Sequence, residues 1–112
     1  MRIDQEHYED MTMVVPQDAL VGDDAMQLGE AFASVLAENP QDVMLDLSKV
    51  TQIDSKGLEV LVGATEQLIR GGRVLKLTAA NETIREILAL TELASLFEYS
   101  DSVDYSTDES IL

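Results

Sequence analysis

Two long segments of the chain carry apolar residues at the spacing of one face of an α-helix. The first begins at one of two adjacent acids, Asp23 or Asp24, which are good helix caps, and it ends at Asn39-Pro40. The second begins at Ser55 or at the residue after it, and it ends before the helix-stopping pair Gly71-Gly72. The inward positions are Ala25, Leu28, Phe32, Val35 and Leu36 in the first segment, and Leu58, Leu61, Val62, Thr65, Leu68 and Ile69 in the second.

Shorter segments before, between and after these two predict β-strands. They lie at residues 3–7, 11–15, 43–47 and 74–78, and a further short edge strand is expected near Tyr99. Asn81 can cap a third helix, whose inward side chains are Ile84, Ile87 and Leu88. The run 43–47 is apolar at nearly every position, which predicts a central strand that helices cover on both faces.

The order of these elements predicts a single α/β domain over residues 1–112. We expect a mixed β-sheet of about four to five strands, covered by three to four helices. Leu93, Leu96 and Phe97 form a separate apolar cluster, which we expect to be a short turn that packs on the core. From about residue 101 the chain is polar and acidic, so we expect a loosely ordered tail.

The chain is strongly acidic, and this narrows its classes of partner. It has 22 acidic and 7 basic side chains among 112 residues, for a formal net charge of -15. Nucleic acid and anionic membrane surfaces both require basic patches, so we expect neither as the main partner, whereas a protein with a basic surface fits. The N-terminal residues lack the apolar core of a signal peptide, and no apolar run approaches the roughly 20 residues of a membrane span. We therefore expect a cytoplasmic protein without membrane insertion.

Little in the sequence points to catalysis or to a bound cofactor. The absence of cysteine excludes disulfides, thiol catalysis and Cys-ligated zinc. We find no nucleophile–base pair, phosphate-binding loop or set of metal ligands, and helix capping explains the acid pair Asp23-Asp24 better than a metal does. We therefore expect a protein that is not an enzyme, with no catalytic residue, no cofactor and no metal.

Ser55, which follows Asp54 at the start of the second long helix, is the candidate regulatory residue. The first N–H groups of a helix lack partners inside it and the helix dipole favours negative charge there, so a phosphate is well tolerated. Ser55 could instead be the N-cap of the helix, and the Asp54 carboxylate could either orient the serine hydroxyl or merely face the dipole. Residue types and spacing leave these alternatives open.

Four motifs in chain order resemble the STAS domain family, in particular the bacterial anti-sigma factor antagonists. The motifs are Asp46-Leu47-Ser48 at a strand end, Asp54-Ser55-Lys56-Gly57-Leu58 after a hydrophobic spacer, Gly71-Gly72-Arg73-Val74 before a strand, and Leu90-Thr91-Glu92-Leu93-Ala94-Ser95-Leu96-Phe97. The resemblance covers about half of the chain in detail, and the N-terminal half by the order of its elements alone.

The resemblance implies a phosphorylation-controlled binding protein in a partner-switching circuit. Its unphosphorylated form would bind an anti-sigma factor that is also a serine kinase of the histidine-kinase-like ATPase type. Phosphorylation at Ser55 would inactivate it, and a serine phosphatase would be a further partner. The partner-binding residues would be Asp54, Ser55, Lys56, Gly57, Leu58 and Glu59.

The sequence departs from the family pattern at two places. Lys56 stands where the family often has a second hydroxyl, which leaves Ser55 as the only acceptor at the site. Residues 16–20 replace the motif that usually follows the second strand. Two alternatives also stay open: a constitutive STAS scaffold of a sensory or transport assembly without a phosphoswitch, and a Gly57 that serves tight packing of the helix rather than the approach of a partner.

Overall fold

The secondary-structure elements follow one another in the order that the sequence predicts. The computed structural model describes residues 2–38, 42–91 and 97–100. Within these ranges the bounds of the first four strands and the start of α2 lie within one residue of those expected. The strands are β1 (Ile3–His7), β2 (Met11–Pro16), β3 (Asp42–Asp46), β4 (Leu75–Thr78) and β5 (Phe97–Ser100), and the helices are α1 (Gly22–Ala37), α2 (Ser55–Arg70) and α3 (Glu82–Leu90).

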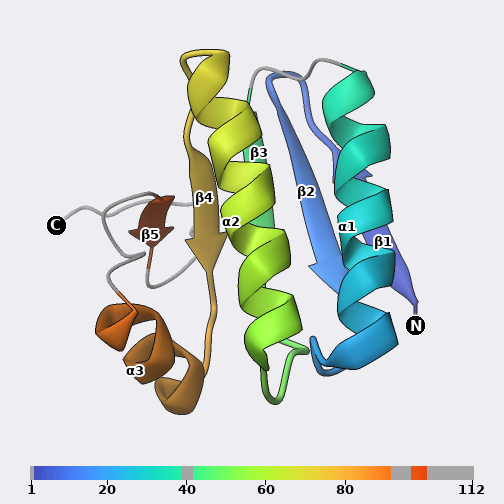
Figure 1. Cartoon of the computed structure of the whole chain (residues 1–112). Helices are drawn as coiled ribbons and strands as arrows, with labels where there is room; N and C mark the ends of the chain where they lie inside the picture. The colour runs from blue at the N-terminus through green and yellow to red at the C-terminus, as the bar shows by residue number, and fades with distance from the viewer. Residues whose placement is uncertain (1, 39–41, 92–96, 101–112) are drawn as a thin grey trace, which may run out of the picture.

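The strands of the described residues form one five-stranded sheet in the order β1-β2-β3-β4-β5 (Figure 1). A tight turn joins β1 to β2, so these two strands are antiparallel, and every later pair of neighbours is parallel. Parallel neighbours need a long crossover between them, and the helices α1, α2 and α3 lie in these three connections. The prediction of a mixed sheet in a single α/β domain is confirmed, as is the edge strand near Tyr99.

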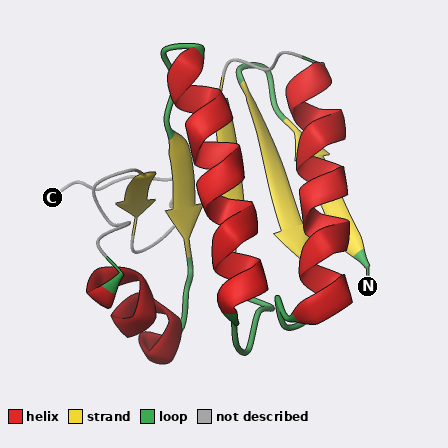
Figure 2. Ribbon diagram, in the orientation of Figure 1, coloured by secondary structure: helices red, strands yellow, loops and turns green. Residues whose placement is uncertain are grey.

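The core lies between the sheet and the two long helices. Figures 1 and 2 show α1 and α2 side by side on one face of the sheet, with α3 beyond one end of β4. Val14, Leu45 and Leu77 stand next to one another on adjacent strands and are fully buried. They belong to the same buried cluster as Leu28 of α1 and Leu61 of α2. The apolar faces predicted from the helical spacing are thus the faces that pack against the sheet.

Within the described ranges, α1 and α2 pack on one face of β3, and no helix of these ranges lies on the other face (Figure 1), contrary to the expectation that helices cover both. Val43 and Leu45 are buried beneath the helices, whereas Met44 between them is only half-buried. On this second face Met44 lies in register with Met13 of β2 and Lys76 of β4. Long neighbouring side chains can cover part of a methionine without a helix, so an apolar strand does not by itself show that two helical layers are present.

The expected capping of α1 by Asp23 or Asp24 is also wrong. The helix begins one residue earlier, at Gly22, and its N-cap position is Val21, whose side chain makes no capping hydrogen bond. Asp23 and Asp24 lie in the first turn instead, where their charges still complement the helix dipole. The helix obtains a capping carboxylate from elsewhere in the fold, as described below.

Some expectations fall wholly or partly on residues outside the described ranges. These are the helix stop at Asn39-Pro40, the apolar residues Leu93 and Leu96, and the acidic tail from residue 101. Phe97, expected in a turn, opens strand β5. In the part of the chain that the structure describes, no helix is long and apolar enough to cross a membrane.

Candidate functional site

Ser55 is the first residue of α2 and lies exposed on the surface. The N-cap of this helix is Asp54, whose side chain accepts a hydrogen bond from the N–H of Gly57 at 3.0 Å. The alternative in which Ser55 caps the helix is therefore wrong. Within the described ranges the Ser55 hydroxyl has no hydrogen-bond partner, so the fold leaves it accessible from outside.

The Asp54 carboxylate joins the first turns of the two long helices. Its Oδ1 accepts the N–H of Gly57 in α2, and its Oδ2 accepts the N–H of Gly22 at the start of α1, each at 3.0 Å. The hydrogen bond from Gly57, together with a smaller contribution from Gly22, holds the pKa of Asp54 below its usual range, although burial acts in the opposite direction. Asp54 is thus a clamp between helices, and its two oxygens are engaged by backbone rather than by the Ser55 hydroxyl.

Further hydrogen bonds tie the loop before Ser55 to its neighbours. The N–H of Leu20 donates to the carbonyl oxygen of Gln52 at 2.9 Å, and the N–H of Asp54 donates to the carbonyl oxygen of Leu20 at 3.2 Å. On the other side, Asn81 caps α3 and its Nδ2 donates to the carbonyl oxygen of Thr51 at 3.1 Å. Connections that follow β2, β3 and β4 meet at this edge of the sheet, and they hold Ser55 on a preformed support.

Gly57 is needed for packing between α2 and the loop before α1. It is buried, and a Cβ at this position would lie 2.5 Å from the carbonyl oxygen of Leu20 and 2.5 Å from Cγ1 of Ile53. Only a residue without a side chain lets the first turn of α2 come so close to the loop before α1. The structure therefore supplies an internal reason for a glycine that the sequence also allowed to be read as a point of partner approach.

The six residues expected to contact a partner share one turn of chain but differ in exposure. Ser55, Lys56 and Glu59 are exposed, Asp54 and Leu58 are half-buried, and Gly57 is buried. Leu58 packs against the hydrophobic core with its inner side. The surface that this turn offers to another protein is thus the serine hydroxyl, one cation, one carboxylate and part of a leucine.

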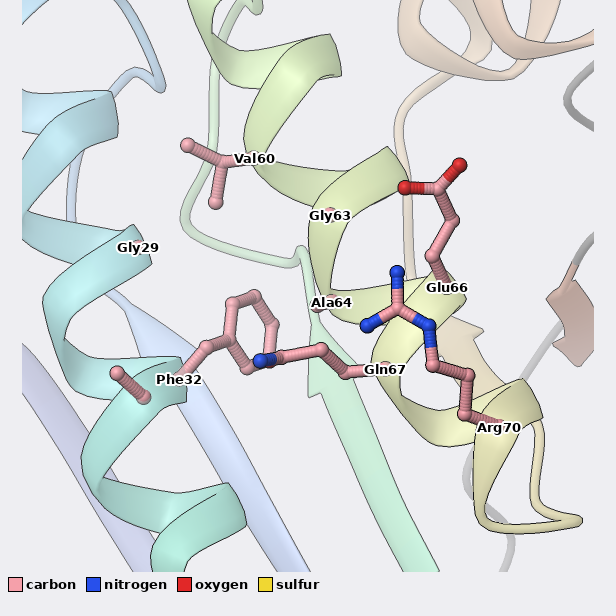
Figure 3. A pocket seen from close by; sticks show the side chains of 9 residues that line it. Gly29, Phe32, Val60, Gly63, Ala64, Glu66, Gln67 and Arg70 are labelled. Atoms are coloured by element: carbon pink, nitrogen blue, oxygen red, sulfur yellow. The ribbon is translucent and has the colours of Figure 1, made fainter.

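Two open hollows flank the exposed ridge of α2. The first, of about 460 Å³, starts at Ser55 and is lined by Leu58, Glu59, Val62, Gly63 and Glu66. The second has a similar volume and lies between α1 and α2; Figure 3 shows its lining of Gly29, Phe32, Ala33, Val60, Gly63, Ala64, Glu66, Gln67 and Arg70. Apart from Ser55, Leu58 and Glu59, none of these residues was expected at a site. A glycine in the middle of a strongly periodic helix was the signal that could have found them.

The chemistry of this region suits binding. In the described part of the chain, no group of histidine and acidic side chains is placed to hold a metal ion. The region offers one exposed hydroxyl at a helix N-terminus, apolar surface from Leu58 and Val62, and carboxylates from Glu59 and Glu66. Such a combination matches a protein surface that is basic and partly apolar.

Comparison with known proteins places the chain in a family. A model of the STAS domain matches residues 2–106. The structure is similar to that of a candidate anti-sigma factor antagonist from Thermotoga maritima, with 24% identity, 90% of this chain and 87% of that chain covered, and a TM-score of 0.84. For an anti-sigma factor antagonist from Mycobacterium paratuberculosis the identity is 24%, the coverage 92% and 87%, and the TM-score 0.79.

A third similar structure is the anti-sigma factor antagonist SpoIIAA. In its unphosphorylated form it is 12% identical, with 91% of this chain and 90% of that chain covered and a TM-score of 0.73. The phosphorylated form from Bacillus gives a TM-score of 0.69 over 90% of this chain and 93% of that chain. At these identities the structural similarities show the fold, whereas the family model matches nearly the whole sequence, and the chain therefore belongs to the STAS domain family.

Proposed function

We propose that this chain is a phosphorylation-controlled anti-sigma factor antagonist, a cytoplasmic binding protein rather than an enzyme. Its unphosphorylated form binds an anti-sigma factor that is also a serine kinase of the histidine-kinase-like ATPase type. The kinase phosphorylates Ser55 and so ends the interaction, and a serine phosphatase removes the phosphate. Similar structures of anti-sigma factor antagonists, one of them in a phosphorylated form, support this proposal.

The observation that carries the proposal is the state of Ser55. Its hydroxyl is exposed, has no hydrogen-bond partner in the described part of the chain, and borders an apolar hollow at the N-terminus of α2. A serine required for stability would be engaged by the fold, but here Asp54 performs the capping. The side chain is thus available for modification without loss of a structural contact.

Charge provides the switching mechanism. A phosphate at Ser55 adds about 1.5 to 2 negative charges beside Asp54 and close to Glu59. The partner must then bury an additional charge for which it has no counter-charge, and this costs several kcal/mol. Because each ~1.4 kcal/mol changes affinity tenfold, a loss of affinity of about 10³-fold is reasonable. The clamp at Asp54 stays in place, so the switch blocks a surface without refolding the domain.

Phosphorylation with purified kinases tests the proposal. The chain is incubated with each serine kinase of this ATPase type from the source organism and with labelled ATP, and the modified peptide is mapped. We expect stoichiometric label on Ser55, none on a Ser55→Ala variant, and normal labelling of a Ser48→Ala control, which removes another exposed serine nearby.

Calorimetric titration of the same kinases completes the test. Ser55→Ala should bind as the parent does, and Ser55→Asp should bind at least about 100-fold more weakly, because it introduces charge at the contact. No label on Ser55, together with equal affinities of the two variants, would contradict the phosphoswitch and favour the constitutive scaffold.

A further inference from the structure

Gly63 lies in the middle of α2, where a glycine is costly. A glycine in a helix interior destabilises it relative to alanine, because the unfolded backbone has more freedom to lose. The other glycines of the two long helices have a reason within the chain. Gly22, the first residue of α1, has a positive φ of +52°, which favours glycine. A Cβ on Gly57 would meet Leu20 and Ile53 at 2.5 Å, and one on Gly29 would contact Val60 at 3.5 Å. At Gly63 a Cβ would have nothing within 4 Å, and the residue is exposed. The fold of the domain therefore gives no steric reason for this glycine.

The position of Gly63 suggests that contact with another protein, rather than packing within the chain, explains this glycine. Gly63 and Glu66 line both hollows of α2, the one that starts at Ser55 and the one between α1 and α2. Without a side chain at residue 63, the ridge of α2 has a gap at which the two hollows meet. In Figure 3 Gly63 lies on α2 above Ala64, with Val60 on the side toward α1 and Glu66 on the side away from it. A protein segment that crosses the ridge here could bring its own backbone close to α2.

The apolar and acidic side chains around the two hollows define which residues a partner segment needs. Leu58 and Val62 line the first hollow, and Phe32 and Val60 line the second. Glu59 and Glu66 border these apolar surfaces, and the whole chain carries a net charge of -15. The second hollow also has one cation at its end, Arg70, so a single acidic or amide group is acceptable there. The complement is an amphipathic segment with apolar anchors and an excess of lysine or arginine.

We propose that Gly63 is the crossing point for a basic amphipathic helix of the anti-sigma factor partner. A small residue of that helix lies over Gly63, one apolar side chain enters each hollow, and basic side chains face Glu59 and Glu66. This inference rests on the proposed function for the identity of the partner, and it extends the contact surface from the turn at Ser55 across to α1.

Substitution of Gly63 tests the crossing point because stability and binding should change in opposite directions. Gly63→Ala should raise the melting temperature by about 2–6 °C, since alanine is the better helix former. The same methyl group should weaken binding of the anti-sigma factor that phosphorylates Ser55 about tenfold or more, and Gly63→Leu should abolish it. The matched control is Ala89→Leu, which enlarges an exposed position of α3 and should bind as the parent does.

Protection of introduced cysteines from alkylation shows whether the contact reaches α1. The chain has no cysteine, so Ala33→Cys on α1 and Ala89→Cys on α3 each introduce a single alkylation site at an exposed position. Bound anti-sigma factor should slow alkylation at position 33 by about tenfold or more and leave position 89 unchanged.

The outcomes separate this inference from the phosphoswitch. If the Gly63 variants bind as the parent does and position 33 is not protected, while Ser55→Asp still binds weakly, the crossing point is refuted and the proposed function stands. If the Gly63 variants bind weakly and Ser55→Asp binds normally, the crossing point is supported and the switch is refuted. If no purified anti-sigma factor of the source organism binds the parent chain, both are refuted.

Discussion

Two adjacent residues at the start of α2 divide the structural task from the proposed regulatory task. The Asp54 carboxylate accepts hydrogen bonds from Gly57 and Gly22, and it thereby caps one helix while joining it to the other. Ser55 makes no such contact within the described ranges and is exposed. Because the cap belongs to Asp54, the proposed phosphorylation of the serine would leave the hydrogen bonds at the helix start intact.

This division predicts unequal losses of stability for two neighbouring alanine substitutions. Ser55→Ala should leave the free energy of unfolding within about 0.5 kcal/mol of the parent, as for a surface position without a structural contact. Asp54→Ala should lower the melting temperature by several degrees, because two backbone N–H groups lose their acceptor. Thermal melts of both variants check this expectation. A larger loss for Ser55→Ala than for Asp54→Ala would show that the serine is the cap.

The Asp54 clamp also predicts a pH dependence. Hydrogen bonding keeps the pKa of Asp54 in the folded state below its value in the unfolded chain. The clamp therefore contributes fully above the unfolded pKa, at about pH 4, and its contribution is lost as the pH falls through the lower pKa of the folded state. The difference in melting temperature between the parent and Asp54→Ala should thus be largest near neutral pH and shrink below about pH 4. Parallel curves over this range would argue against the clamp.

At the scale of the helices, glycines at different positions serve different purposes. Gly57 allows α2 to approach the loop before α1, whereas Gly29 faces Val60 across the helix pair at an ordinary contact distance. The two long helices meet the sheet on the same face, so a small residue at either position changes how they pack (Figure 2). The effect of each glycine on packing therefore depends on which atoms lie opposite it.

A matched pair of substitutions tests this difference. Gly57→Ala should destabilise the fold by about 1–3 kcal/mol, because the new methyl group would lie 2.5 Å from Leu20 and Ile53. Gly29→Ala meets Val60 at 3.5 Å and should be neutral or stabilise by up to about 1 kcal/mol. Denaturant unfolding measures both effects. Equal free energies of unfolding for the two variants would mean that the loop before α1 yields easily.

For the whole molecule, the dominant property is its negative charge. A net charge of -15 on 112 residues repels itself in the folded state and attracts basic partners from a distance. Salt screens both interactions, with a Debye length of about 10 Å at 0.1 M. Stability and association should consequently respond to salt with opposite signs.

Salt titration and two charge reversals test the role of charge. Raising the ionic strength should increase the melting temperature and reduce the association rate with a basic partner. Lys56→Glu should slow association and Glu59→Lys should alter its salt dependence, with melting temperatures near that of the parent, because both side chains are exposed. Stopped-flow binding and thermal melts measure these quantities. Association rates that are independent of both salt and the reversals would place the contact elsewhere.

The sequence by itself was sufficient for the order of the elements, for the single α/β domain and for the position of Ser55 at a helix start. These features depend on local properties, namely the period of apolar residues and the turn-forming pairs, whereas the cap at Asp54 was not predicted. Local patterns did not predict features that depend on which other segment packs against a strand or helix. The apolar strand β3 did not reveal that the two long helices, α1 and α2, both pack on the same one of its faces.

Only the tertiary structure decided how the site is held together. The hydrogen bond from Gly22 to Asp54 joins residues 32 positions apart, and the contact that requires Gly57 comes from Leu20 in another loop. The hollow lined by both Phe32 of α1 and Gly63 of α2 exists because the two helices pack side by side. Such features arise from packing between segments remote in sequence, and the spacing of residues along one segment carries no information about them.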